Sequence, residues 1–318
     1  MAYQTGDNIL DDLYNGFANT NTNNVNKIWG VGTGDYGWGQ SNTVDTVDAG
    51  DTVTAAQWNT LLTRMRSIAD HQGTGINTTD SGQLATGDVI AAISTIDADM
   101  TTLGNARLTA ASDNITVSSD VTGTRTFTGS WTTSTVHEFR ATFAGGDEAR
   151  YFFNGGGYIQ FAGTLASYTD RHKTKDWENL LETRFGTFKL LAETSSESGN
   201  ATPATNNTST GYYDLSTSYA VIFKMMGGQL TYDYYDDNFI QVEAKANGEH
   251  GDARGNVGEQ VTVKVTLSDA AADDGASNTD QVDGNLKFAY ALGKPNTTQW
   301  NNDSICSITT AEVSQSQS

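Results

Sequence analysis

The chain has 318 residues, with 18 Lys or Arg against 38 Asp or Glu, so its formal net charge is −20. This length suffices for one large or two moderate domains with a buried core, and the acidic balance argues against nucleic acid as a partner. A single cysteine, Cys306, excludes an internal disulfide framework and a multi-cysteine metal site. No apolar run approaches the ~20 residues of a membrane helix, so we expect no membrane insertion.

The first third of the sequence has the apolar spacing of helices, three and four residues apart. Helices are expected over residues 8–17 and 86–107, with a short piece that reaches Trp29. Residues 30–39 form a glycine-aromatic stretch that contains the pattern G-x-G-x-x-G. A dinucleotide-binding turn needs a buried strand before this pattern and a helix after it. Neither is indicated here, so we interpret the stretch as a flexible loop.

The strongest helical signal lies at residues 54–72. Thr54 and Gln57 have the spacing of a capping box, and Gly73 supplies a left-handed stop. The apolar residues between these caps predict one buried stripe along the helix. The stripe consists of Trp58, Leu61, Leu62, Met65, Ile68 and Ala69.

From residue 115 onward the apolar period changes to two, which is typical of strands with one buried face. A short helix over 177–185 interrupts this pattern. Alternating strands joined by Gly, Asn and Asp turns predict an antiparallel sandwich or jelly roll. The sequence therefore predicts an α+β fold, with a helical region over 1–112, a β-sandwich or jelly-roll-like domain over 113–311 and a mobile tail over 312–318. The clearest strands are marked by Tyr219, Val221, Phe223 and Met225; by Ile240, Val242, Ala244 and Ala246; by Val261, Val263, Val265 and Leu267; and by Leu286, Phe288, Tyr290 and Leu292.

Three polar segments, 193–211, 248–258 and 268–284, contain too little apolar surface to offset the entropy cost of ordering. We expect them to be exposed loops with long polar tips, and such loops are candidate contact surfaces. Acidic residues in or near them offer hard oxygen ligands for Ca²⁺, although neither group has EF-hand spacing and a solvated acidic loop is the favoured interpretation. The two groups are Asp233, Asp236 and Asp237, and Asp269, Asp273, Asp274 and Asp283.

The segment from Arg150 to Gly157 reads Arg-Tyr-Phe-Phe-Asn-Gly-Gly-Gly. Aromatic residues that run into glycines, followed by more strand formers from Tyr158, predict a β-hairpin. In that hairpin Tyr151 and Phe153 would share one strand face and Phe152 the other. Because both faces are aromatic, we expect both to be covered.

Residues that could carry chemistry are scattered. The four histidines, His71, His137, His172 and His250, lack the i, i+4 pairing of a metal site, and no G-x-S-x-G elbow is present for an esterase nucleophile. Several aromatic residues near the polar segments could stack on sugar rings, although packing in the sandwich is the favoured interpretation. These are Tyr212, Tyr213, Tyr232, Tyr234, Tyr235 and Trp300.

Several segments together resemble the virion structural proteins of tailed marine phages, cyanophages in particular. The stretch Arg150–Gly156 resembles the "RYFFN-GG" segment of that family, and residues 54–61 with His71-Gln72-Gly73 resemble its "ITAAQWN-L…HQ-G" block. Further matches run in the family's order as far as 177–187, so the resemblance spans about residues 28–190. It implies a virion component such as a fibre, collar or baseplate accessory, and it brings no catalytic residue.

The leading hypothesis is a non-enzymatic virion structural protein, assembled in the host cytoplasm and without a cofactor. Its helical region would dock to the particle, and its partners would be other virion proteins and two further copies in a homotrimer. The alternatives are a module that binds a host-surface glycan, with Ca²⁺ as a candidate ligand of the acidic loops, and a glycan-cleaving tail enzyme. The predicted core and assembly residues are Trp58, Leu61, Met65, Ile68, Arg150, Tyr151, Phe152, Phe153, Asn154 and Trp177.

Overall fold

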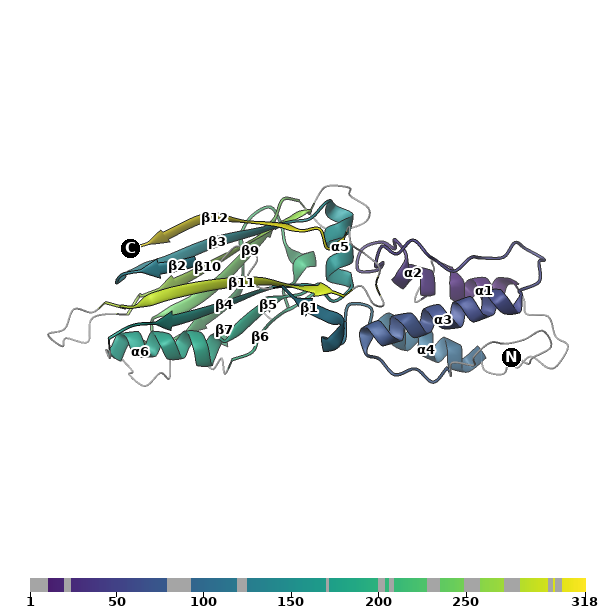
Figure 1. Ribbon diagram of the computed structural model, residues 1–318, viewed down its shortest axis with the longest axis horizontal. Coiled ribbons are helices and arrows are strands. Elements are labelled where there is room, and N and C mark those ends of the chain that lie inside the picture. The colour runs from purple at the N-terminus through teal and green to yellow at the C-terminus, as the bar shows by residue number, and fades with distance from the viewer. Residues whose placement is uncertain are drawn as a thin grey trace.

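The structure is a computed structural model that describes residues 11–19, 24–78, 93–118, 125–169, 172–199, 204–205, 209–227, 235–248, 258–271, 281–296, 300 and 305–318. A helical region, which contains α1 to α4, and a strand-rich region lie end to end (Figure 1). The order of helices first and strands afterwards confirms the predicted α+β class.

The helical region contains α1 (Asp11–Ala18), α2 (Val25–Trp29), α3 (Ala55–Gln72) and α4 (Ile93–Asn105). The predicted capping box is present at the start of α3, where Thr54 and Gln57 exchange hydrogen bonds between side chain and backbone, and Gly73 ends the helix with a φ of 69°. The predicted stripe of α3 is buried, and the Trp58 ring lies 6.0 Å from that of Tyr14 in α1. Residues 8–10 and 86–92 of the expected helices lie outside the described residues.

The described strands form two antiparallel sheets of six. The first has the order β1-β11-β4-β5-β6, with β2 also paired to β11, and the second has the order β12-β3-β10-β9-β8-β7. The first sheet is built from β1 (Ile115–Val117), β2 (Arg125–Thr128), β4 (Tyr158–Ala166), β5 (Thr187–Leu190), β6 (Ser195–Glu197) and β11 (Asn285–Pro295). The second sheet is built from β3 (Ser134–Thr142), β7 (Ala204–Thr205), β8 (Ala220–Met226), β9 (Phe239–Ala246), β10 (Gln260–Ser268) and β12 (Thr309–Gln317).

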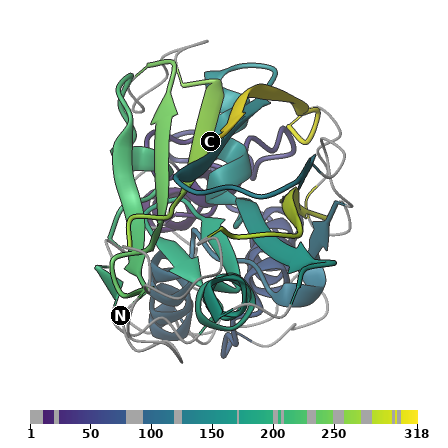
Figure 2. The same ribbon diagram turned by 90° about the vertical axis from the view of Figure 1, so that its left-hand side faces the viewer.

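The two sheets pack face to face over an aromatic core, and we call them together the sandwich (Figure 2). Phe139 of β3 stacks on Tyr290 of β11 with ring centroids 4.4 Å apart, and Phe188 of β5 lies 5.7 Å from Phe223 of β8. The apolar residues predicted to alternate along β9, β10 and β11 are all buried, as the period of two requires.

The alternation predicted for β8 is wrong at its start. A bulge lies between Val221 and Phe223 in the pairing with β9. An extra residue reverses the inward and outward positions of the strand, so Ile222 is buried whereas Val221 is 44% exposed.

The predicted hairpin at residues 150–161 is also wrong in its first half. Residues 146–154 form a helix, α5 (Gly146–Asn154), instead of a strand, so the expected division of Tyr151, Phe152 and Phe153 between two strand faces does not occur. Asp147 and Glu148 in the first turn favour a helix N-terminus electrostatically. The glycine turn and a strand that starts at Tyr158 are present as predicted, and Phe152 and Phe153 are both fully buried.

Residues 312–318 are not the mobile tail that the sequence suggests. Residues 309–317 form β12, which pairs with β3 from Thr309 to Gln317. The strand contributes little to the apolar core, since most of its side chains are exposed. Backbone hydrogen bonding, which depends little on side-chain type, therefore accounts for the strand.

The short helix predicted at 177–185 is present as α6 (His172–Glu178), which continues through a π-helical stretch (Asn179–Phe185) and ends at Gly186 with a φ of 64°. Of the three predicted loops, 193–211 contains β6 and β7 and is therefore partly strand. Most of 248–258 and 268–284 lies outside the described residues.

Candidate functional site

The residues of the Arg150–Gly157 segment lie where the helical region meets the sandwich (Figure 1). Because α5 is a helix, Arg150 and Asn154 are one turn apart and share a face. That face contacts residues 31–37, the glycine-aromatic loop of the helical region. On the sandwich side, Phe153 stacks on Tyr212 at 4.2 Å.

Arg150 donates hydrogen bonds to three backbone carbonyls of the loop. Its guanidinium lies 2.8 Å from Val31 O, 3.3 Å from Gly34 O and 2.5 Å from Tyr36 O. Asp147 accepts from the same guanidinium at 3.2 Å. The side chain is only 3% exposed, and a rigid fork of donors suits several acceptors at once.

Asn154 adds a second set of contacts to the same loop. Its amide donates to Gly34 O at 3.2 Å and Gly37 O at 3.0 Å. The Tyr213 hydroxyl lies 2.7 Å from Asn154 Oδ1 and 2.8 Å from Gly34 O. Burial raises the pKa of Tyr213 above its usual range, so the hydroxyl stays protonated and can donate.

Aromatic rings and the His71 imidazole make further contacts between the two regions, next to this loop. Trp38 Nε1 donates to Asn154 O at 3.1 Å, and Trp300 Nε1 donates to Trp38 O at 2.8 Å. His71, near the end of α3, lies 2.8 Å from Gly155 O through Nε2, and its ring centroid is 4.6 Å from that of Trp38. Burial lowers the pKa of His71, which favours the neutral ring.

Glycine is required in this junction at two kinds of position. Gly37 has a φ of 95°, and a Cβ there would lie 2.2 Å from Val31 O. A Cβ on Gly155 would lie 2.5 Å from the Trp300 ring. The G-x-G-x-x-G pattern therefore reflects a tightly folded loop against α5, and our interpretation of a flexible loop was wrong.

The arrangement is a clamp, by which we mean Arg150, Asn154, Tyr213, Trp38, His71 and Trp300 with the loop 31–37. Every side chain in it donates to, or lies against, protein backbone of the other region. The donors are already occupied by carbonyl groups, so the geometry fixes the two regions against each other.

The predicted core and assembly residues do not form one site. Trp58, Leu61, Met65 and Ile68 lie inside the helical region, and the segment 150–154 lies in the junction. Trp177 packs within the sandwich against Trp131, with ring centroids 4.8 Å apart. All ten predicted residues are buried.

Three of the other candidates, His137, Asp269 and Asp283, form hydrogen bonds or ion pairs within the protein. His137 lies between Tyr290 and Glu312, at 3.3 and 3.0 Å. Asp269 forms a buried ion pair with Lys173 at 2.8 Å, and Asp283 accepts from Thr174 at 2.8 Å. In the described part of the chain no three His, Cys, Asp or Glu residues are grouped as a metal site would need.

Three of the four candidate sugar-stacking rings among the described residues face inward. Tyr212, Tyr235 and Trp300 are at most 2% exposed, so packing is their role. His250, Asp233, Asp273, Asp274, Tyr232 and Tyr234 lie outside the described residues.

Sequence reasoning missed the contacts of Trp38 and Tyr213 with Asn154, from which they lie 116 and 59 residues away in the chain. Assignment of 146–154 as a helix would have placed Arg150 and Asn154 on one face and would have indicated a contact there. No sequence signal connects that face to the loop 31–37.

Comparisons of the chain with protein-family models, with curated proteins and with solved structures found no match. Among the described residues, no helix has both the length and the apolar character needed to cross a membrane.

Proposed function

We propose that this protein is a non-enzymatic structural component of a tailed-phage virion and acts through protein–protein assembly. The proposal starts from the resemblance of residues 28–190 to marine phage virion proteins. A fibre, collar or baseplate accessory is the corresponding place in the particle, with assembly in the host cytoplasm.

One observation carries the proposal. The two segments with the strongest resemblance, 54–73 and 150–156, are far apart in the sequence and meet at the clamp, where His71 Nε2 lies 2.8 Å from Gly155 O. The shared residues thus include His71, Arg150 and Asn154, which fix one region against the other. A fixed two-part body suits a component that transmits position within an assembly.

The structure changes which surface of the helical region can contact a particle. The apolar stripe of α3 is buried within the protein, and Trp58 is 1% exposed. Trp58 itself is therefore packed within its own chain, and a contact of the Trp58 helix with a neighbouring copy would use other residues. Docking through the helical region would use the polar outer face of α3, where Thr60 and Thr63 are exposed.

Edge strand β12 is the surface that best fits association with further copies. It ends the second sheet in the order of the described strands. Its nine residues include one charge, Glu312, and neither Lys nor Pro, which are the usual blocks to edge pairing. We propose that the β12 edge of each copy contacts a different surface of the next copy in a homotrimer, because pairing of β12 with β12 would close a dimer, and that other virion proteins contact the helical end.

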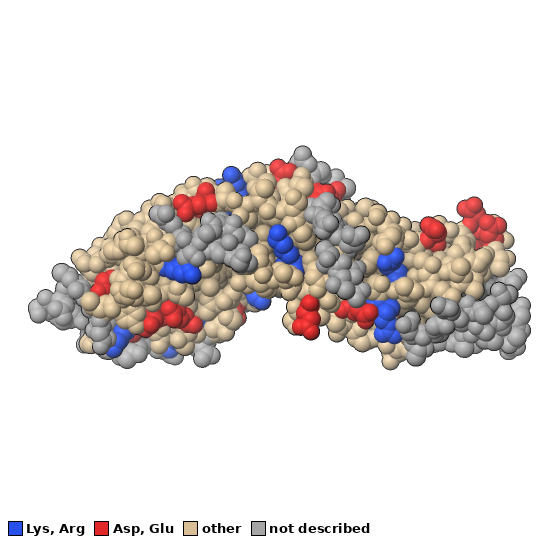
Figure 3. Space-filling model, viewed as in Figure 1, with Lys and Arg blue, Asp and Glu red and all other residues tan. Residues whose placement is uncertain are grey.

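Charge sets the conditions for that assembly. On the face shown in Figure 3, Lys and Arg occur singly among Asp and Glu. The net charge of −20 opposes association, and added salt screens this repulsion. Sedimentation velocity at low and at marine ionic strength should show a trimer that strengthens with salt. A monomer at all concentrations and salts would reject the trimer.

The virion role is tested by antibodies raised against the recombinant chain. Density-gradient-purified particles of the phage that encodes it should contain the protein in a fixed number per particle, and immunogold electron microscopy should place it. Presence in the infected-cell lysate together with absence from particles would reject the proposal.

A further inference from the structure

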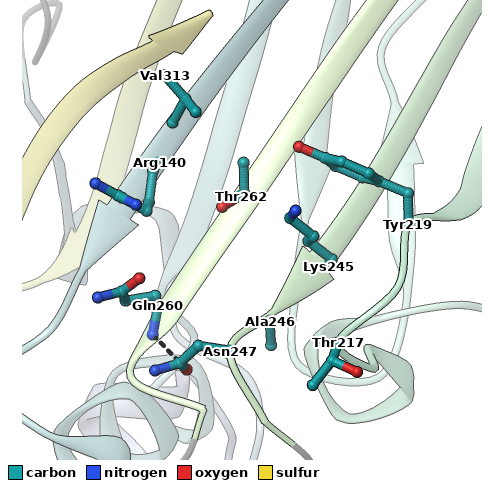
Figure 4. Close-up of a pocket in the computed structure, with 9 residues that line it drawn as sticks. All are labelled: Arg140, Thr217, Tyr219, Lys245, Ala246, Asn247, Gln260, Thr262 and Val313. Atoms are coloured by element: carbon teal, nitrogen blue, oxygen red, sulfur yellow. Dashed lines mark hydrogen bonds between the residues drawn. The ribbon is translucent and has the colours of Figure 1, made fainter.

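An open hollow of about 280 Å³ lies on the outer face of the second sheet, at the ends of β3, β9 and β10 nearest the helical region (Figure 4). The strand register places Thr262 of β10 directly opposite both Arg140 of β3 and Lys245 of β9. These three side chains form one row across the sheet. Thr262, which is 6% exposed, is the floor, and the two cationic side chains are the walls.

The neighbouring row of the same face has a different charge balance. There Lys264 lies opposite Glu138 and Glu243, and its Nζ is 2.7 Å from Glu243 Oε2. That lysine is neutralised by carboxylates of its own chain. The row at the hollow differs, because both residues opposite Thr262 are cationic and no carboxylate lines the hollow.

The residues that line the hollow include Arg140 and Lys245 but no carboxylate. Arg140 Nε is buried and has no hydrogen-bond partner among the described residues. An unsatisfied buried donor is costly, and an arginine fork is well suited to a carboxylate. In a chain with 38 acidic and 18 basic residues, such a pair of cations points to an anionic ligand from outside.

The rest of the lining suits a ligand with several hydroxyl groups. Thr217, Thr262 and the amides of Asn247 and Gln260 supply neutral donors and acceptors around the two cations. Asn247 is held in place because its Oδ1 accepts from Gln260 N at 3.0 Å. Val313 of β12 offers an apolar surface at the rim, on which the C–H face of a ring can pack.

Tyr219 fixes the position of the Lys245 side chain. Lys245 Nζ lies over the Tyr219 ring, 4.3 Å from its centroid, which is a favourable cation–π distance. Burial, and secondarily the neighbouring Glu138, raise the pKa of the Tyr219 hydroxyl above its usual range. The phenol is therefore neutral at physiological pH and adds no competing negative charge to the hollow.

We infer that this hollow binds the carboxylate-bearing ring of an acidic saccharide, a uronic acid residue being the simplest case. Arg140 and Lys245 would hold the carboxylate, and the hydroxyl and amide groups would hold ring hydroxyls. A carboxylate from a second copy of the chain is less well matched, because it would leave those neutral groups unused. The inference is independent of the virion role.

The test is isothermal titration calorimetry of the full chain with D-galacturonate and with tri-galacturonate. Neutral galactose and acetate at the same ionic strength are the comparison ligands. We expect binding of the acidic sugars that neither galactose nor acetate reproduces. Arg140→Gln and Lys245→Gln should each weaken it by at least about tenfold, since each removes a charged hydrogen-bond donor.

Lys287→Gln is the matched control, because it makes the same charge change at an exposed position of β11, in the other sheet and outside the hollow. It should change the affinity by less than about twofold. If Arg140→Gln does not fold, Arg140→Lys retains the charge without the fork and should still weaken binding. Circular dichroism verifies the fold of each variant.

Five results would overturn the inference. The first four are no heat of binding up to about 10 mM sugar, equal binding of galactose, equal binding of acetate, which would indicate a simple anion site, and equal losses in Lys287→Gln and Arg140→Gln. A fifth is an oligomer that Arg140→Gln dissociates, because the occupant would then be a carboxylate of a second copy.

Discussion

Replacement of Arg150 by alanine is the strongest test of how much the clamp contributes to the free energy of unfolding. The guanidinium donates to three loop carbonyls and is 3% exposed, so water is a poor substitute for it. Hydrogen bonds from a charged donor contribute about 1.5–3 kcal/mol each, and bonds that share one group do not add fully. We expect Arg150→Ala to lower the free energy of unfolding by about 3–5 kcal/mol.

Differential scanning calorimetry and guanidinium titration measure this loss. A fall in Tm of roughly 4–8 °C corresponds to the expected change, because the entropy of unfolding scales with chain length. Lys287→Ala, at an exposed position of β11, removes the same charge and should have an effect within about 0.5 kcal/mol of zero. Arg150→Lys should fall between the two, because one ammonium cannot reach three carbonyls. A loss below about 1 kcal/mol in Arg150→Ala would refute the assigned role.

Three further changes examine other parts of the account. Trp58→Ala should cost about 3–5 kcal/mol, because it opens a cavity against Tyr14; an unchanged Tm would show that α3 is peripheral. Tyr213→Phe should cost about 0.5–1.5 kcal/mol by urea titration, since it removes one buried hydroxyl, and a stabilised variant would contradict the contact. The lowered pKa of His71 means that the unfolded chain binds the proton more readily, so stability should be complete above about pH 6.5 and should fall as the pH drops below that value. In His71→Gln this part of the pH dependence should be absent in denaturation curves recorded from pH 7.5 to 5, and an unchanged slope would show that another group causes it.

Much of the fold follows from local patterns in the sequence. The capping box at Thr54 and the period of two in β9, β10 and β11 are determined by neighbouring residues, and both are present. The failures occur where tertiary contacts decide between two local options. Arg150–Asn154 contains strong strand formers. Asp147 and Glu148 in the first turn of α5, and the hydrogen bonds of Arg150 to the loop 31–37, nevertheless favour a helix.

Pairing partners are a second limit of sequence reasoning. β12 is polar and mostly exposed, so its sequence contains no apolar alternation to mark it as a strand. The bulge at Val221 shifts one residue without any glycine or proline to signal it. Likewise the row of Arg140, Thr262 and Lys245 exists only because of strand register, which joins residues more than 100 positions apart.

The central claim is that the clamp holds the helical region and the sandwich as one rigid body. Pulsed electron–electron spin resonance tests it directly, with spin labels on Thr63→Cys in α3 and Lys287→Cys in β11, both exposed positions, in a Cys306→Ser background that removes the single native cysteine. The account predicts one narrow distance distribution, which broadens when Arg150→Ala is added. A distribution that is broad from the start, or that Arg150→Ala leaves unchanged, would contradict the claim.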